Sequence, residues 1–198
     1  MIALESLATV DARDAYTAGH SRRVRQLALA IGSELGLGNG ELRALGDAAL
    51  FHDIGKLAIP DEILLKPTSL TDEEWELMRS HSDEGARMIE RVGFVQEAAP
   101  AIRHHHERFD GSGYPDGLAG EQIPLAARVI HLADALDSIL TTRVYRPGRP
   151  AREALAEVRS ATGSQFCPAC VSALVRVVAR GELEELGVPK RALVAAVR

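Results

Sequence analysis

The sequence has little of what membrane insertion, secretion or disulfide bonding would require. Nowhere in its 198 residues do eighteen apolar residues follow one another, and the N-terminal MIALESLATVDARD has no charged leader before an apolar run. The only two cysteines, Cys167 and Cys170, form one CPAC motif. This is too little sulfur for a four-thiolate zinc site or a disulfide framework. We therefore expect a cytoplasmic protein whose cysteines are structural, with a redox role as the weaker alternative.

Charge of one sign is not concentrated either. The 23 basic and 28 acidic residues leave a formal charge of -5, and the basic residues are scattered rather than gathered into a stripe. We therefore expect no broad face for a nucleic acid polymer or a membrane. The chain also lacks internal repeats and low-complexity linkers, and its 46% hydrophobic content can build one sizeable core. A single domain spanning residues 1–198 is predicted.

Runs of alternating Val, Ile or Thr are few, whereas Ala- and Leu-rich segments with apolar spacing of three and four are frequent. This pattern predicts a mainly helical domain. Thr71 with Glu74 forms a capping-box pattern, and Gly55 is placed to end the helix that carries His52. Residues 182–198 are expected to form a terminal helical appendage. The predicted helices span residues 2–14, 17–36, 40–54, 72–92, 95–107, 124–142, 151–162 and 168–180, with a short one at the end.

Ionisable side chains fall on the apolar faces of these predicted helices. His20 shares a stripe with apolar residues at helical spacing, and His52 ends a similar stripe with Asp53 beside it. His81 lies on the apolar side of the following helix. Asp134 begins an acidic strip on an otherwise apolar helix. We expect all of these side chains to point inward.

One histidine on an apolar face is most often a core residue satisfied by a hydrogen bond. Here four helices and one loop are each expected to direct His or Asp inward. Burying an ionisable group costs several kcal/mol unless another group pairs with it. Metal ions are the simplest partner, because imidazole and carboxylate ligands without thiolate suit Fe, Mn, Zn, Ni or Co. Two such ions about 3.5–4 Å apart recur in phosphatases and nucleases, where they activate water and stabilise charge on phosphate.

Five motifs then occur in one order along the chain: DARDAYTAGHSRRV, HDIGKLAIPDEIL, MRSHSDEGARMI, HHERFDGSGYPDGLAGEQIPLAARVI and ADALDSILTTRVYR. From about residue 5 to about residue 175 the sequence resembles the HD-GYP domain, a branch of the HD phosphohydrolase superfamily. The resemblance implies an all-α fold, an HD-domain helical bundle with an HD-GYP C-terminal helical extension. It also implies a two- or three-metal site that hydrolyses cyclic di-GMP to linear pGpG, and sometimes on to GMP.

The same resemblance implies which residues bind metal. Members of the three-metal type have a Glu four residues before the first ligand histidine, where this chain has Tyr16. We therefore expect two divalent metal ions, Fe or Mn, with Zn, Ni or Co as alternatives. His104 and His131 fall outside the ligand pattern and are expected to support the fold or the ligands. The implied ligands are His20, His52, Asp53, His81, His105, His106 and Asp134, with Asp53 as the bridge and the choice between His105 and His106 open.

Catalytic and substrate-binding roles also follow from the resemblance. A hydroxide shared by the metals is expected to attack phosphorus in line, with Asp53 and Lys56 as the catalytic residues. A cation at a helix C-terminus is the competing role for Lys56. Asp137 is expected to bind substrate or to orient a ligand or a basic partner. The implied substrate-binding residues are Arg143, Arg146, Asp137, Gly113 and Tyr114, with plain solvent exposure as the alternative for the arginines.

The loop HHHERFDGSGYPDG, residues 104–117, receives its own interpretation. Glu107 is expected to orient an imidazole. The glycines at positions 111, 113 and 117 allow turns and close approach by a ligand. A plain surface loop with turn residues is the alternative, but the position directly after the histidine pair favours function.

The chain departs from the family pattern at Thr142, Val144 and Cys167, where Asp, Pro and Asp are usual. The first two are expected to affect the substrate-gripping loop and the third only a helix cap. Two other functions stay open: an HD hydrolase of another cyclic or linear dinucleotide, such as hybrid cyclic GMP-AMP, and a non-catalytic cyclic di-GMP signalling adaptor. The helices at residues 2–14 and 168–198 are candidates for a homodimer or a diguanylate cyclase contact. An upstream sensor or receiver domain is expected to be absent from this chain.

Overall fold

A computed structural model describes residues 19–93, 95–142, 147–186 and 188. The helix predicted over residues 2–14, the substrate-binding candidates Arg143 and Arg146, and most of the predicted terminal appendage lie outside the described residues. The described part of the chain is helical and contains no strand, only an isolated bridge between Thr162 and Phe166. The all-α prediction is therefore confirmed. Within that part, no helix combines the length and apolar character needed to cross a membrane.

The helices match the predicted order, with several changes at their boundaries. The predicted helix over residues 168–180 is confirmed as α10. The α-helices are α2 (His20–Glu34), α3 (Asn39–Phe51), α4 (Asp61–Leu64), α5 (Asp72–Arg79), α6 (His81–Glu90), α7 (Ala99–His104), α8 (Leu125–Leu140), α9 (Ala151–Ser160) and α10 (Pro168–Arg180). The 3-10 helices are η1 (Ile54–Ala58), η2 (Gln96–Ala98), η3 (Gly120–Gln122) and η4 (Glu184–Leu186).

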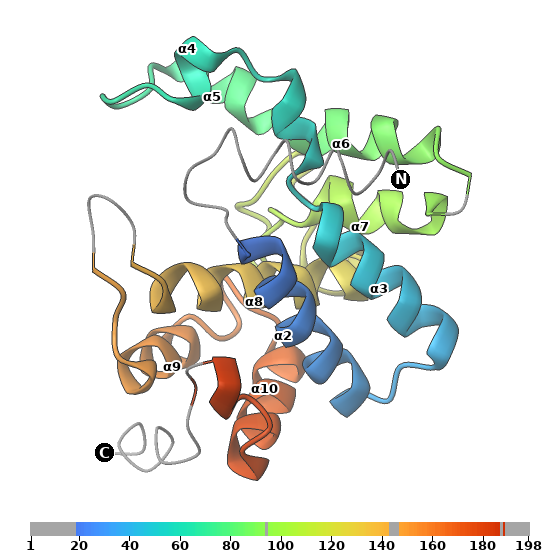
Figure 1. The fold of residues 1–198 in the computed structure, drawn as a ribbon, viewed down its shortest axis with the longest axis vertical. Helices are drawn as coiled ribbons and strands as arrows, with labels where there is room; N and C mark the ends of the chain where they lie inside the picture. The colour runs from blue at the N-terminus through green and yellow to red at the C-terminus, as the bar shows by residue number, and fades with distance from the viewer. Residues whose placement is uncertain (1–18, 94, 143–146, 187, 189–198) are drawn as a thin grey trace.

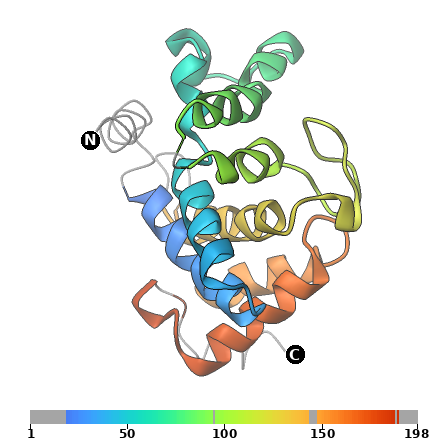
Figure 2. The same cartoon turned by 90° about the vertical axis from the view of Figure 1, so that its right-hand side faces the viewer.

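Helix α8 is the centre of the bundle. It contacts α2, α3, α7, α9 and α10, while α2 and α3 pack against each other (Figure 1). Figure 2 shows α6, α7 and α8 stacked one below another, with α4 and α5 above them and α9 and α10 below. Fully buried aliphatic side chains from several helices form the core, among them Ile31, Leu45, Leu132, Leu136 and Leu174. In this stack α3 and α7 contact α8 directly, whereas α5 packs against α4 and α6.

Two predicted boundaries were wrong in an instructive way. The helix predicted over residues 72–92 is two helices, α5 and α6, separated at Ser80. The capping box that starts α5 is confirmed, because the Thr71 hydroxyl accepts from the backbone of Glu74 while the Glu74 carboxylate accepts from the backbone of Thr71. The helix predicted to run to residue 54 ends at Phe51 and continues as η1.

Gly55 does not end a helix but allows a close contact. It lies inside η1, and an added Cβ would be 1.9 Å from the carbonyl oxygen of His81 and 2.5 Å from the backbone nitrogen of Gly85. Real Cβ contacts of this length do not occur, so only glycine lets η1 approach α6 so closely. This contact places the residues just before η1 against the start of α6.

Candidate metal centre

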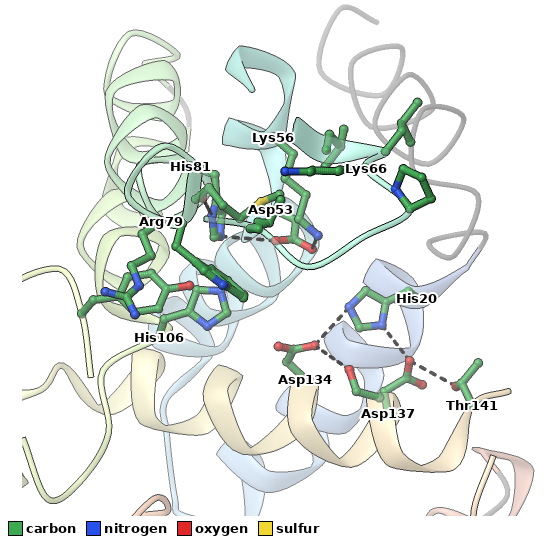
Figure 3. A pocket seen from close by; sticks show the side chains of 18 of the residues that line it. His20, Asp53, Lys56, Lys66, Arg79, His81, His106, Asp134, Asp137 and Thr141 are labelled. Carbon is green, nitrogen blue, oxygen red and sulfur yellow. Dashed lines mark hydrogen bonds and ion pairs between the residues drawn. The ribbon is translucent and has the colours of Figure 1, made fainter. Parts of the chain in front are cut away.

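The structure brings the seven predicted ligands together in two groups. They come from α2, the end of α3, the start of α6, the end of α7 and the middle of α8. Within each group, one ligand atom per residue lies within 4.8 Å of all the others. Figure 3 shows His81, His106 and Asp53 on one side of the cavity and His20 and Asp134 on the other. The groups are Asp53, His81, His105 and His106, and His20, His52 and Asp134.

Three of these imidazoles are held in the same way, with Nδ1 donating to the backbone carbonyl three residues earlier. A carbonyl oxygen only accepts, so Nδ1 carries the proton and Nε2 of the neutral ring keeps its lone pair. Nε2 of all three rings is buried and has no hydrogen-bond partner among the described residues. Burial also lowers the pKa of His81 and His105, which favours the neutral form. The pairs are His52 with Ala49 (2.8 Å), His81 with Met78 (2.6 Å) and His105 with Ile102 (2.6 Å).

Asp53 lies between the two groups. Its Oδ2 is 3.4 Å from Nε2 of His52, and its Oδ1 is 3.6 Å from Nε2 of His81. The ammonium group of Lys56 donates to Oδ2 at 2.8 Å. Burial alone would raise the pKa of Asp53, but the positive charge of Lys56 beside it holds that pKa well below its usual range. The carboxylate is therefore ionised and directs one oxygen toward each group.

His20 is held between two carboxylates of α8. Its Nδ1 donates to Oδ2 of Asp137 at 2.7 Å, and its Nε2 lies 3.2 Å from Oδ1 of Asp134. Arg23, one turn after His20, donates to both oxygens of Asp137 at 2.6 and 3.0 Å. Burial opposes charge on His20, but Asp134 and Asp137 raise its pKa to about 10, so a metal ion bound here would have to displace the proton from Nε2. Asp137 thus orients a predicted ligand, one of the roles expected from the sequence, while its contact with substrate stays a prediction.

His106 connects the cluster to the glycine-rich loop. Its ring stacks on Tyr114 with centroids 4.8 Å apart, and the guanidinium carbon of Arg79 lies 5.4 Å from the centre of the Tyr114 ring. Burial lowers the pKa of His106 to about 3, so this imidazole is neutral and able to act as a metal ligand. Burial raises the pKa of Tyr114 above its usual range, so the phenol is protonated.

Several contacts tie down the loop that follows His106. Glu107, expected to orient an imidazole, is buried; its Oε1 accepts the backbone N–H of Asp116 at 2.8 Å and lies 3.7 Å from Nδ1 of His104. Arg103 binds the Asp116 carboxylate through both Nη atoms and donates from Nε to Asp83 at 2.8 Å. At Gly113 an added Cβ would lie 2.3 Å from the backbone nitrogen of Arg108, so this glycine permits close packing of the loop.

These residues surround a cavity of about 1010 Å³. Most of the predicted ligands line it, together with Lys56, Tyr114 and Asp137, whereas His52 and His105 are buried beside it. Gly113 is not among the lining residues, so its predicted substrate contact stays a prediction. His131 donates from Nδ1 to the backbone carbonyl of His105 at 2.9 Å, which agrees with its expected supporting role.

Sequence reasoning missed the wall of the cavity opposite α8. This wall includes Trp75 and Arg79 of α5 and Lys66 of the loop before α5. Arg23 of α2 also lines the cavity, next to Asp137 of α8. Helical spacing could have found Arg23, because it lies three residues after His20. No pattern in the sequence distinguishes Trp75 from a core residue.

The chemistry of the cluster fits divalent metal ions. Buried Nε2 atoms without partners are costly unless something accepts their lone pairs, and neutral imidazoles whose other nitrogen donates to a backbone carbonyl are typical metal ligands. The fold and the cluster therefore define a class: an all-α domain with a His/Asp centre able to bind divalent metal. The family model described as HD domain matches residues 8–169, and the chain belongs to this family. Its resemblance to HD-GYP phosphodiesterases is thereby confirmed.

Relatives of known name agree with this assignment. The chain is 41% identical over 179 residues to the cyclic di-GMP phosphodiesterase response regulator RpfG of Xanthomonas campestris pv. campestris, covering 89% of this chain and 47% of the relative. It is 36% identical over 169 residues to the 3'3'-cGAMP-specific phosphodiesterase 3 of Vibrio cholerae, covering 85% and 37%. The chain thus spans less than half the length of either relative.

Solved structures support the fold independently. The crystal structure of the cyclic GMP-AMP specific phosphodiesterase V-cGAP3 of V. cholerae superposes with a TM-score of 0.72. The alignment covers 97% of this chain and 52% of that chain at 22% sequence identity. At this identity the likeness shows a shared fold.

Proposed function

We propose that this chain is a metal-dependent phosphodiesterase that hydrolyses cyclic di-GMP to pGpG, and to GMP where the linear product is also accepted. The observation that carries the proposal is the set of three buried Nε2 atoms without partners, converging with Asp53 beside a cavity of about 1010 Å³. The identity to a named cyclic di-GMP phosphodiesterase supports the choice of substrate.

The seven clustered residues would hold two divalent ions, Fe or Mn, with Zn, Ni or Co as alternatives. Such ions supply Lewis-acid activation of water and stabilise charge that develops on phosphate. Asp53, whose two oxygens face different groups, is proposed to belong to both ligand sets. His20 keeps its orientation through Asp137, which in turn is held by Arg23.

Lys56 is the proposed phosphate contact of the protein itself. Its ammonium group lines the cavity and is 2.8 Å from Oδ2 of Asp53. A cation beside the cluster would neutralise a non-bridging phosphate oxygen as negative charge increases during hydrolysis. No protein side chain is proposed as the nucleophile, because metal ions held by the cluster would supply activated water.

The test is product analysis of cyclic di-GMP incubated anaerobically with protein loaded with Fe(II) or Mn(II), with Asp53→Ala as the blank. We expect metal-dependent pGpG or GMP from the wild type, and neither metal retention nor product from Asp53→Ala. Normal turnover by Asp53→Ala would refute the two-metal mechanism. Absence of product from wild-type protein with verified metal content would refute cyclic di-GMP as the substrate.

Hybrid cyclic GMP-AMP is a second candidate substrate, favoured by the 36% identity to a phosphodiesterase named as specific for it. The same assay with 3'3'-cGAMP separates the two. A higher kcat/KM for cyclic di-GMP than for the hybrid dinucleotide would support the first proposal, and the reverse order would support the second.

A further inference from the structure

The segment of residues 60–80, between η1 and α6, carries apolar side chains that are not buried. From residue 60 to residue 80 no residue is buried, although buried Ile59 and His81 flank the segment. The segment contains α4 and α5, which project from the body of the bundle in Figure 1. Among the described residues, the exposed large apolar side chains all fall within it: Leu65 (54% exposed), Trp75 (46%) and Leu77 (49%).

These side chains do not serve the core. None of the large apolar residues from position 63 to position 78 belongs to the hydrophobic core cluster or to the residues packed against it. Most of them line the cavity instead. The apolar lining from this segment consists of Leu64, Leu65, Pro67, Leu70, Trp75 and Met78.

Cationic groups border this apolar wall. Lys56, Lys66 and Arg79 line the same cavity as the clustered His and Asp residues (Figure 3). A site with an apolar wall, cationic groups and a metal centre suits a ligand that carries phosphate and flat apolar rings together. The volume of about 1010 Å³ is at the upper end of the 300–1000 Å³ typical of small-molecule sites, so it has room for more than one phosphate group.

Trp75 is the aromatic side chain of this cavity that is open to a ligand. Tyr114 also lines it, but its ring is already in contact with His106 and Arg79. Trp75 takes part in no aromatic or cation contact among the described residues. Its backbone is fixed in α5, where its N–H donates to Thr71 at 2.9 Å just after the capping box.

We propose that the cavity-lining apolar side chains between residues 64 and 78 form the nucleobase-binding wall of the active site, with Trp75 stacking on a purine of the cyclic dinucleotide. This inference rests on the proposed function, because it takes the cyclic dinucleotide as ligand. Stacking tolerates either purine, since every base presents a π face. Trp75 therefore contributes affinity for a purine dinucleotide and does not by itself select guanine over adenine.

Kinetics with matched variants test the proposal. Trp75→Ala removes the ring, Trp75→Phe keeps an aromatic surface, and Leu77→Ala removes a similarly exposed apolar side chain of α5 that does not line the cavity. We expect Trp75→Ala to raise KM for cyclic di-GMP roughly 5- to 150-fold. Trp75→Phe is expected to recover most of the affinity, and Leu77→Ala to match the wild type.

A second readout uses the fact that Trp75 is the only tryptophan in the chain. Its fluorescence reports one side chain, and a slowly hydrolysed bis-phosphorothioate analogue of cyclic di-GMP is expected to quench it in the metal-loaded protein. Hydrolysis of bis(p-nitrophenyl) phosphate, which lacks purines, reports the metal centre alone. Leu77→Ala, whose side chain does not line the cavity, is expected to hydrolyse it at the wild-type rate, and Trp75→Ala is expected to lose less activity toward it than toward cyclic di-GMP.

The outcomes separate this inference from the proposed function. An unchanged KM in Trp75→Ala, an equal loss of bis(p-nitrophenyl) phosphate hydrolysis, or no fluorescence change at saturating analogue would each overturn the base-stacking wall. If the wild type hydrolyses bis(p-nitrophenyl) phosphate but not cyclic di-GMP, the proposed substrate is wrong. Quenching by 3'3'-cGAMP would then still support the wall, and no quenching by either dinucleotide would refute it.

Discussion

Gly55→Ala is expected to separate Asp53 from His81 without removing any ligand. In the structure an added Cβ would lie 1.9 Å from the His81 carbonyl oxygen, and contacts under 3.0 Å essentially never occur. The η1 and α6 backbones must therefore move apart by at least about 1 Å. The Oδ1 of Asp53 and Nε2 of His81 are 3.6 Å apart now, so a displacement of this size changes their relation substantially.

Three measurements report the change. Forced expansion of a packed interior costs about 1–3 kcal/mol, which denaturant unfolding would detect as a lower free energy of unfolding. A misplacement of about 1 Å in a catalytic group can cost roughly 100-fold in rate, so we expect metal content and phosphodiester hydrolysis to fall together. Elemental analysis after metal loading measures the metal content, and a bis(p-nitrophenyl) phosphate assay measures the rate of hydrolysis.

Gly93→Ala is the matched control, because an added Cβ there meets nothing within 4 Å. It introduces the same methyl group and should leave metal content and hydrolysis unchanged. If Gly55→Ala retained wild-type metal content and rate while remaining folded, the close approach of η1 to α6 would not determine the metal centre. The role assigned to the glycine of HDIGK would then be wrong.

Three further predictions test other parts of the site. Asp137→Ala should weaken metal binding roughly 10- to 100-fold in a chelator competition titration, because His20 loses the carboxylate that orients it; unchanged affinity would contradict this. The hydrogen bond from Cys170 lowers the pKa of Cys167 to about 5 despite partial burial, helped by backbone N–H groups and Arg128. A group whose pKa is lowered in the folded state adds stability that is complete above its unfolded pKa and is lost as the pH falls through its folded pKa. The difference in free energy of unfolding between wild type and Cys167→Ala, measured by denaturant unfolding, should therefore widen from pH 5 to pH 9. A difference that does not change with pH would refute the thiolate. Arg143→Ala should chiefly raise KM for cyclic di-GMP, and an unchanged KM would remove Arg143 from the substrate site.

Periodic apolar faces were sufficient to predict that several His and Asp side chains point inward, whereas His105 and His106 were named as ligands only from the resemblance to the HD-GYP family. Helical spacing turns His20 and Asp134 toward the core without knowledge of their partners. It could not divide the seven ligands into two groups, since that division depends on how α2, α3 and α8 cross. The position of Asp53 between the groups likewise results from packing.

Contacts that depend on tertiary structure were predicted poorly. Glu107 was expected to orient an imidazole and its Oε1 lies 3.7 Å from Nδ1 of His104, but the sequence did not predict that the backbone of Asp116 folds back to donate to the same oxygen. That contact requires the loop to close over nine positions, and no local pattern encodes it. Gly55 was interpreted as a helix end because glycine often has that role, whereas a backbone from another helix determines its identity here.

The break at Ser80 links fold to site. Nδ1 of His81 donates to a carbonyl in the last turn of α5, and Nδ1 of His52 and of His105 does the same at the ends of α3 and α7. Carbonyls in the last helical turn lack intrahelical partners, so a histidine just beyond the helix can satisfy one of them. The same hydrogen bond fixes the protonated nitrogen and directs Nε2 away from the helix. A continuous helix over residues 72–92 would give the Met78 carbonyl an intrahelical partner and would leave Nδ1 of His81 without this acceptor. The ends of three helices thus orient three imidazoles. This explains why the helix predicted over residues 72–92 is interrupted at Ser80, the residue before the predicted ligand His81.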